Sequence, residues 1–209
     1  MCIRDSYGSN NSDLGTGKIT LSVKSKTASS KFTDVTASNV GSWAADSIDF
    51  CADNDLVNGK STYSFAPKDN LTRGQLVAIL YRAAGSPSVT GTTNPFNDVK
   101  TGDYYYNAVL WAYKNDVVNG TGAGKFSPNA NVTREQIAAI LYRYMGSPAA
   151  TGSLSGYTDR SKISSWATTA MQWAIGKGYI TGTSSTTLDP LGQATRAQAA
   201  VMLHRFLTK

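Results

Sequence analysis

Apolar residues recur at helical spacing in three stretches of the chain, and each stretch follows a Thr-Arg-x-Gln sequence. The stretches are LVAILYR, IAAILYR and AAVMLHR. The arginines that precede them are separated by 61 residues (Arg73 to Arg134) and 62 residues (Arg134 to Arg196). A period of this length indicates several small structural units rather than one large domain.

Each stretch begins with a signal for a helix N-terminus. Thr followed three residues later by Gln is a capping box, in which the Thr hydroxyl accepts from the N3 amide and the Gln side chain accepts from the N-cap amide. The pattern predicts helices that begin after Thr72, Thr133 and Thr195. An earlier apolar pattern at helical spacing precedes each of them, in the first copy at Trp43, Ala44, Ser47, Ile48, Cys51 and Ala52. Each unit is therefore predicted to be a helix, a loop and a second helix.

The first-turn arginine of each second helix is not explained by helix stability. A cation there lies at the positive end of the helix dipole, whereas the arginines in the last turn (Arg82, Arg143 and Arg205) lie where the dipole favours them. Helix stability therefore accounts for the last-turn set. Two interpretations remain for Arg73, Arg134 and Arg196. Either a free helix N-terminus and a guanidinium together hold an anion, or the guanidinium bonds backbone carbonyls of a neighbouring repeat.

The loops carry repeated landmarks. An aromatic residue followed two residues later by Asp predicts a loop clamped to the core, with the carboxylate capping a turn. These aspartates are Asp34, Asp98 and Asp159. The first helices end near Gly59, Gly120 and Gly182, where glycine suits a left-handed turn or a close approach of backbone to a ligand.

Three sets of aligned residues have predicted environments. Phe50, Trp111 and Trp173 are predicted to lie in the core, whereas Trp43, Tyr104 and Trp166 open their helices, where a groove wall competes with a core position. The single histidine, His204, aligns with Tyr81 and Tyr142, which predicts a ring in a packing position rather than a catalytic base. Cys51 aligns with Ala112 and Ala174, which predicts a small buried residue.

Composition narrows the function. The net charge of +6 is scattered without a basic run, which suits an anionic polymer but does not indicate nucleic-acid binding. No apolar run is long enough to insert in a membrane. Cys2 and Cys51 form neither a metal-binding spacing nor a disulfide framework. No nucleophile elbow or pair of distinct carboxylates stands out, so we expect no enzyme activity, no catalytic residue, no metal and no cofactor.

The repeats predict the organisation of the chain. Residues 32–90, 91–152 and 153–209 form three repeats, and residues 1–31 are expected to be a remnant of an upstream region plus a linker. Within that remnant, residues 17–24 alternate apolar and polar as a half-buried strand does. The chain is thus expected to be the C-terminal part of a longer protein.

Taken together, the landmarks resemble three tandem S-layer homology domains over residues 32–208. The resemblance implies a mainly α fold, in which three helix-loop-helix pseudo-repeats form a pseudo-threefold spindle with a shared helical core. It implies an extracellular location at the cell wall or surface layer of a Gram-positive-type envelope. It also implies non-covalent attachment of a surface protein to secondary cell-wall polysaccharide, which is anionic and often carries pyruvate ketals, in grooves between repeats. The ligand-binding residues that the resemblance implies are Arg73, Arg134, Arg196, Asp34, Asp98, Asp159, Gly59, Gly120 and Gly182. We add the helix-opening residues Trp43, Tyr104 and Trp166 as expected groove walls.

Two departures from the family pattern and one alternative function remain. Gln replaces the family's Glu in the Thr-Arg-x-Glu signature, which keeps the capping box but removes a negative charge beside the arginine. The third repeat opens with Tyr157 and has Arg160 where the others have Val, so its groove is expected to be altered or non-binding. The alternative, from a different class, is a protein–protein module that self-assembles in a surface layer through the same repeat surfaces.

Overall fold

A computed structural model describes residues 31–209 of the chain, so the predicted strand at residues 17–24 lies outside the described residues. Residues 31–209 form helices and no sheet, which confirms the predicted mainly α class. The helices are α1 (Ala37–Val40), α2 (Ser42–Asp53), α3 (Arg73–Ala83), α4 (Tyr106–Lys114), α5 (Arg134–Tyr144), α6 (Thr168–Gly176) and α7 (Arg196–Thr208), with short 3₁₀ helices η1 (Arg160–Lys162) and η2 (Ser165–Ala167). None of these described helices combines the length and apolarity needed to span a membrane.

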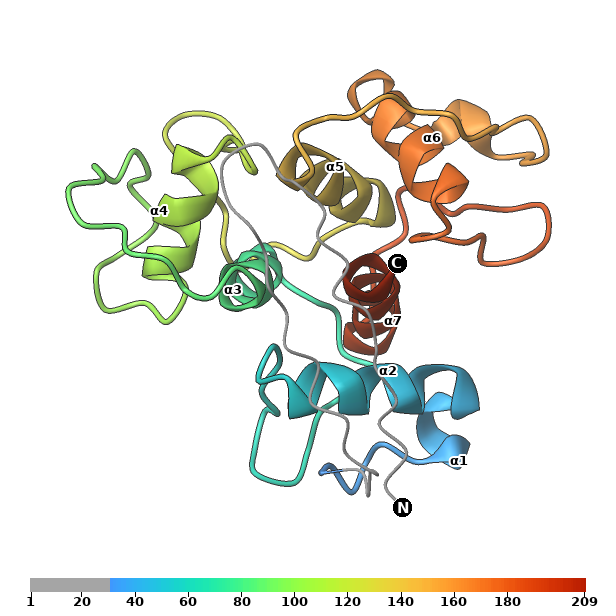
Figure 1. The fold of residues 1–209 in the computed structure, drawn as a ribbon, viewed down its shortest axis with the longest axis horizontal. Helices are drawn as coiled ribbons and strands as arrows, with labels where there is room; N and C mark the ends of the chain where they lie inside the picture. Colours follow the sequence, from blue (N-terminus) through green and yellow to red (C-terminus); the bar gives the residue numbers. More distant parts are fainter. Residues whose placement is uncertain (1–30) are drawn as a thin grey trace, which may run out of the picture.

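The second helices of the three repeats, α3, α5 and α7, lie around the centre of the molecule, and α2, α4 and α6 surround them (Figure 1). Each central helix packs against the first helix of the next repeat: α3 against α4, α5 against α6, and α7 against α2. The helix pairs are therefore made between repeats rather than within them. Their apolar faces join in a single hydrophobic cluster, as the shared-core prediction requires.

A closed ring of backbone hydrogen bonds joins the segments that lead into the central helices. The amide of Leu71 donates to the carbonyl of Ala194 (2.9 Å), Ala194 donates to Val132 (2.9 Å), and Val132 donates to Leu71 (3.0 Å). The three side chains are almost fully buried. Because each repeat supplies one donor and one acceptor, the ring closes only when all three repeats are present.

All three predicted capping boxes are formed. The amides that follow the N-cap are not free, because they donate to the next repeat. In α3, the Arg73 amide donates to the Ala130 carbonyl (2.9 Å) and the Gly74 amide to the Pro128 carbonyl (2.8 Å). The corresponding amides of α5 and α7 donate in the same way to Gly192, Pro190, Asp69 and Pro67. A free helix N-terminus, on which the anion interpretation partly rested, is therefore wrong for these helices.

The aligned rings pack against one another, and Trp111 and Trp173 are buried as predicted, whereas Phe50 is only partly buried at the edge of the core. His204 stacks on Phe50 with ring centroids 4.1 Å apart, in the position where Tyr142 contacts Trp173 at 5.5 Å. Tyr81 and Trp111 form the third such pair. Cys51 is fully buried, as expected, and burial raises the pKa of its thiol to about 12. The three ring pairs join helices of neighbouring repeats.

Candidate functional site

The first-turn arginines are buried and bond the next repeat. The Nε of Arg73 donates to the Phe126 carbonyl (2.9 Å), and its Nη2 donates to the Asn119 carbonyl (3.2 Å). Arg134 makes the equivalent bonds to Leu188 and Thr181, and Arg196 makes them to Phe65 and Asn58. These bonds confirm the carbonyl interpretation. A direct role of the same arginines in ligand binding stays a prediction.

One of the three arginines has a second cation as its charged neighbour. Burial lowers the pKa of Arg73, nearby Arg143 lowers it further, and Asp98 has a raising effect. Burial also lowers the pKa of Arg134 and of Arg196, but the next contribution to each comes from an aspartate, which raises it. Positive charge is therefore concentrated beside Arg73.

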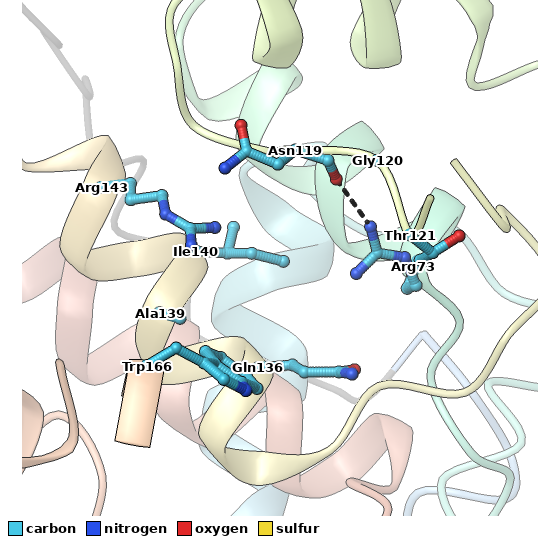
Figure 2. A pocket seen from close by; sticks show the side chains of 9 residues that line it. All are labelled: Arg73, Asn119, Gly120, Thr121, Gln136, Ala139, Ile140, Arg143 and Trp166. Carbon is cyan, nitrogen blue, oxygen red and sulfur yellow. Dashed lines mark hydrogen bonds between the residues drawn. The ribbon is translucent and has the colours of Figure 1, made fainter. Parts of the chain in front are cut away.

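A hollow of about 300 Å³ lies at this point, lined by residues of all three repeats. Figure 2 shows Arg73 facing the side chains of α5 across this space, with the turn that carries Asn119 on one side and Trp166 on another. We call this space the inter-repeat hollow; its lining is Arg73, Asn119, Gly120, Thr121, Gln136, Ala139, Ile140, Arg143 and Trp166. It includes no carboxylate.

The Arg143 guanidinium differs from those of the two equivalent arginines. Arg82 donates to the Leu56 carbonyl (3.0 Å), and Arg205 donates to the Thr181 hydroxyl (3.2 Å). Arg143 donates no side-chain hydrogen bond within residues 31–209, and its side chain is partly exposed. Among the described residues, therefore, no group occupies the hydrogen-bond donors of this cation in the hollow.

The three aspartates cap the loops, as the sequence predicts. Asp34 accepts from the amides of Phe65 and Ala66 at 2.8 Å. Asp98 and Asp159 accept from the equivalent amide pairs. Burial acts to raise the pKa of Asp34, but the hydrogen bonds outweigh it and leave this pKa below its usual value; the same holds for Asp159. None of the three lines the hollow, so their role in binding stays a prediction.

Gly59, Gly120 and Gly182, which lie in the loops after α2, α4 and α6, are required by close packing. A Cβ on Gly120 would lie 2.7 Å from the Lys125 carbonyl oxygen, and Gly59 and Gly182 meet loop carbonyls even more closely. None of the three has a positive φ, so the predicted left-handed turn is wrong. The close approach is to the protein's own loop. Gly120 alone of the three lines the hollow.

The helix-opening aromatics are exposed rather than buried. Trp43, Tyr104 and Trp166 expose 57%, 64% and 53% of their surfaces, and Trp166 lines the hollow. Only Trp43 lies inside its α-helix, because Tyr104 precedes α4 and Trp166 belongs to η2. Arg160, the departure in the third repeat, is exposed, donates to the Tyr157 carbonyl and does not line the hollow.

Sequence reasoning missed four polar residues of the hollow. Gln136 and Arg143 had been assigned only to helix capping and to the helix dipole, and Asn119 and Thr121 had no assigned role. Gln136, Ala139, Ile140 and Arg143 occupy positions i, i+3, i+4 and i+7 of α5, which share one helix face. The polar residues at both ends of this helix face, Gln136 and Arg143, were the sequence signal that could have indicated the hollow.

The comparisons with known proteins agree with this architecture. The sequence matches the S-layer homology domain family at residues 31–77, 95–138 and 156–200. It is 31% identical over 176 residues to an amylopullulanase of Thermoanaerobacterium thermosulfurigenes, covering 80% of this chain and 9% of that protein. It is 28% identical over 172 residues to a surface-layer 125 kDa protein of Lysinibacillus sphaericus (79% and 14%) and 24% identical over 153 residues to a cellulosome-anchoring protein of Acetivibrio thermocellus (69% and 34%). The chain thus spans a small part of each relative, and the enzyme name concerns other parts of that large protein.

Proposed function

Because this chain belongs to the S-layer homology domain family, we propose that it anchors a surface protein by binding an anionic secondary cell-wall polysaccharide between its repeats. Domains of this family bind the cell wall and are not catalytic, and the chain's location is the cell wall or surface layer. The inter-repeat hollow is the principal groove, and a carboxylate such as that of a pyruvate ketal is the group it recognises.

The observation that carries the proposal is the arginine pair in the hollow. Arg143 donates no side-chain hydrogen bond to the part of the chain that the structure describes, and its charge lowers the pKa of the nearby Arg73. No carboxylate lines the space. Two cations beside a hollow whose lining holds no carboxylate favour an anion between them. A guanidinium can bond both oxygens of a carboxylate in a planar, bidentate arrangement.

The remaining lining suits a sugar. Trp166 is about half exposed, so its indole ring can cover the C–H face of a sugar ring. Gln136 and Thr121 line the same space. The Gln136 oxygen accepts from the Thr133 amide, which leaves its amino group to donate to a sugar hydroxyl, and the Thr121 hydroxyl, which donates to the Lys125 carbonyl, can accept from one. A hollow of about 300 Å³ is at the lower end of the sizes of small-molecule sites, about 300–1,000 Å³, and suits a short stretch of polymer.

In this proposal Arg73, besides contributing charge to the hollow, also fixes its wall together with Asp98. Arg73 fixes the Asn119 carbonyl at the edge of the hollow, and Asp98 holds the far end of the same loop through the Phe126 and Ser127 amides. The turn that contributes Asn119, Gly120 and Thr121 is thereby held in place before a ligand arrives. Such preorganisation reduces the entropy lost on binding.

A sedimentation assay with purified cell-wall sacculi tests the function. The protein should co-sediment with native sacculi and fail to do so after the secondary polysaccharide has been removed chemically. Unchanged binding after that removal would refute the proposal. Concentration-dependent assembly in the absence of polymer, measured by analytical ultracentrifugation, would instead support the self-assembly alternative.

A further inference from the structure

Glu135 is a buried carboxylate in the first turn of α5, and its burial needs an explanation beyond helix stability. It is the single glutamate of the chain, and only 2% of its surface is exposed. An acidic residue in the first turn of a helix is stabilising even when it faces solvent. Burying it removes water from a charge, which is unfavourable unless hydrogen bonds replace that water. The helix dipole therefore explains a glutamate at this position but not its burial.

The partner of Glu135 belongs to the next repeat. One carboxylate oxygen accepts from the Ser164 amide at 2.9 Å, and the other accepts from the Ser164 hydroxyl at 2.7 Å. Ser164 is the N-cap residue of η2, and Trp166 is the second of its three residues. Glu135 thus holds the backbone from which the indole of the inter-repeat hollow projects.

The other two repeats lack this device. The residues equivalent to Glu135 are Gly74 and Ala197, which carry no acceptor side chain. At Gly74 the ring of Tyr105 takes the space, because a Cβ there would lie 2.9 Å from its Cδ1 atom. The two-bond link is thus made beside the hollow that contains Arg143, where the fold alone does not require it.

We infer that Glu135 is a positioning residue that sets the orientation of Trp166 over the hollow and thereby specialises this groove for ligand. The inference rests on the proposed function, in which Trp166 covers a sugar ring. The Glu135 carboxylate does not line the hollow and acts through Ser164. Its removal should therefore loosen one indole rather than the whole fold.

The orientation of Trp166 can be measured without any ligand. The chain has four tryptophans, so protein labelled with 5-fluorotryptophan should give four ¹⁹F resonances, assigned with Trp166→Phe and Trp43→Phe. In Glu135→Ala the Trp166 resonance should shift and narrow, and the resonance of Trp43, at the equivalent position of another repeat, should not change. Glu135→Gln keeps an oxygen acceptor for Ser164 and should restore the wild-type resonance. An unchanged Trp166 resonance in Glu135→Ala, or an equal change in the Trp43 resonance, would overturn the inference.

Binding of soluble wall polymer then links orientation to function. Ordering one side chain corresponds to about 0.5–1.5 kcal/mol, so Glu135→Ala should weaken the affinity by about two- to tenfold. In a Trp166→Ala background the same substitution should have no further effect on affinity. An equal loss in both backgrounds would show that Glu135 acts on the fold in general and would overturn the inference. If no variant, including Arg143→Gln, alters binding, the proposed function fails, whereas the ¹⁹F result still decides the positioning of Trp166.

Discussion

Replacing Arg73 with alanine should destabilise the protein, because its side chain joins two repeats. Arg73 is 7% exposed, and its guanidinium donates at 2.9 and 3.2 Å to the carbonyls of Phe126 and Asn119. It also lies 4.7 Å from the centroid of the Phe126 ring. Alanine would leave both carbonyls without this donor and would remove the cation–π contact.

The expected magnitude follows from these contacts. Hydrogen bonds that involve a charged group contribute about 1.5–3 kcal/mol each, so two of them set a range of about 3–6 kcal/mol. The Asn119 bond is partly solvated and water can replace it, so we expect about 3 kcal/mol, the lower end of that range. For a chain of this size about 1 kcal/mol corresponds to about 2–4 °C, so Tm should fall by about 6–12 °C.

Thermal unfolding followed by circular dichroism measures this loss, and Arg143→Ala is the matched control. Arg143 donates no side-chain hydrogen bond within the described residues, so its removal should change the free energy of unfolding by about 0.5 kcal/mol or less. An Arg73→Ala protein that melts within about 2 °C of the wild type would show that the bonds to the next repeat contribute little, and the structural role assigned to Arg73, Arg134 and Arg196 would be wrong.

Three further results are expected. Gly120→Ala should lower the free energy of unfolding by about 1–3 kcal/mol in urea titrations, because its Cβ would lie 2.7 Å from the Lys125 oxygen. The control Gly102→Ala, whose Cβ would have no atom within 4 Å, should not lower it, and equal stabilities of the two variants would refute the packing argument. Folding lowers the pKa of Asp34 and of Asp159, so both stabilise the fold above the ordinary carboxyl pKa of about 3.9 and lose this effect as the pH falls through the lowered values. Asp34→Asn should therefore flatten the dependence of stability on acid pH, and an unchanged pH profile would contradict this. Polymer affinity should fall as salt rises, since exposed charges are screened within about 10 Å at 0.1 M, and affinity independent of salt would indicate a neutral ligand.

The fold was largely predictable because its signals are local and occur three times. Capping boxes, helical spacing and the alignment of His204 with Tyr81 and Tyr142 each depend on a few neighbouring residues, and all are confirmed. Cys51 could be placed in the core because alanine stands at the equivalent positions. Repetition made each pattern visible three times and so separated it from chance.

The site was less predictable because it is made between repeats. Arg73 bonds a carbonyl of the second repeat, and Trp166 of the third repeat lines the same hollow. Both placements depend on which helices pair, and α3 pairs with α4 of the next repeat. The helix dipole gave Arg143 a sufficient structural explanation and so hid its place in the hollow. Glu135 looked like a first-turn acid, and only the contact with Ser164 reveals its second role.

The central claim is that the inter-repeat hollow binds the anionic polymer through Arg143. Isothermal titration of soluble wall polymer into Arg143→Gln, with Arg82→Gln as the control, tests it most directly, because Arg82 is the equivalent residue of another repeat and already bonds the Leu56 carbonyl. Loss of a charged hydrogen bond of about 1.5–3 kcal/mol predicts an affinity about ten- to a hundredfold weaker for Arg143→Gln and little changed for Arg82→Gln. An Arg143→Gln protein that binds like the wild type, or an Arg82→Gln protein that is weakened equally, would contradict the account.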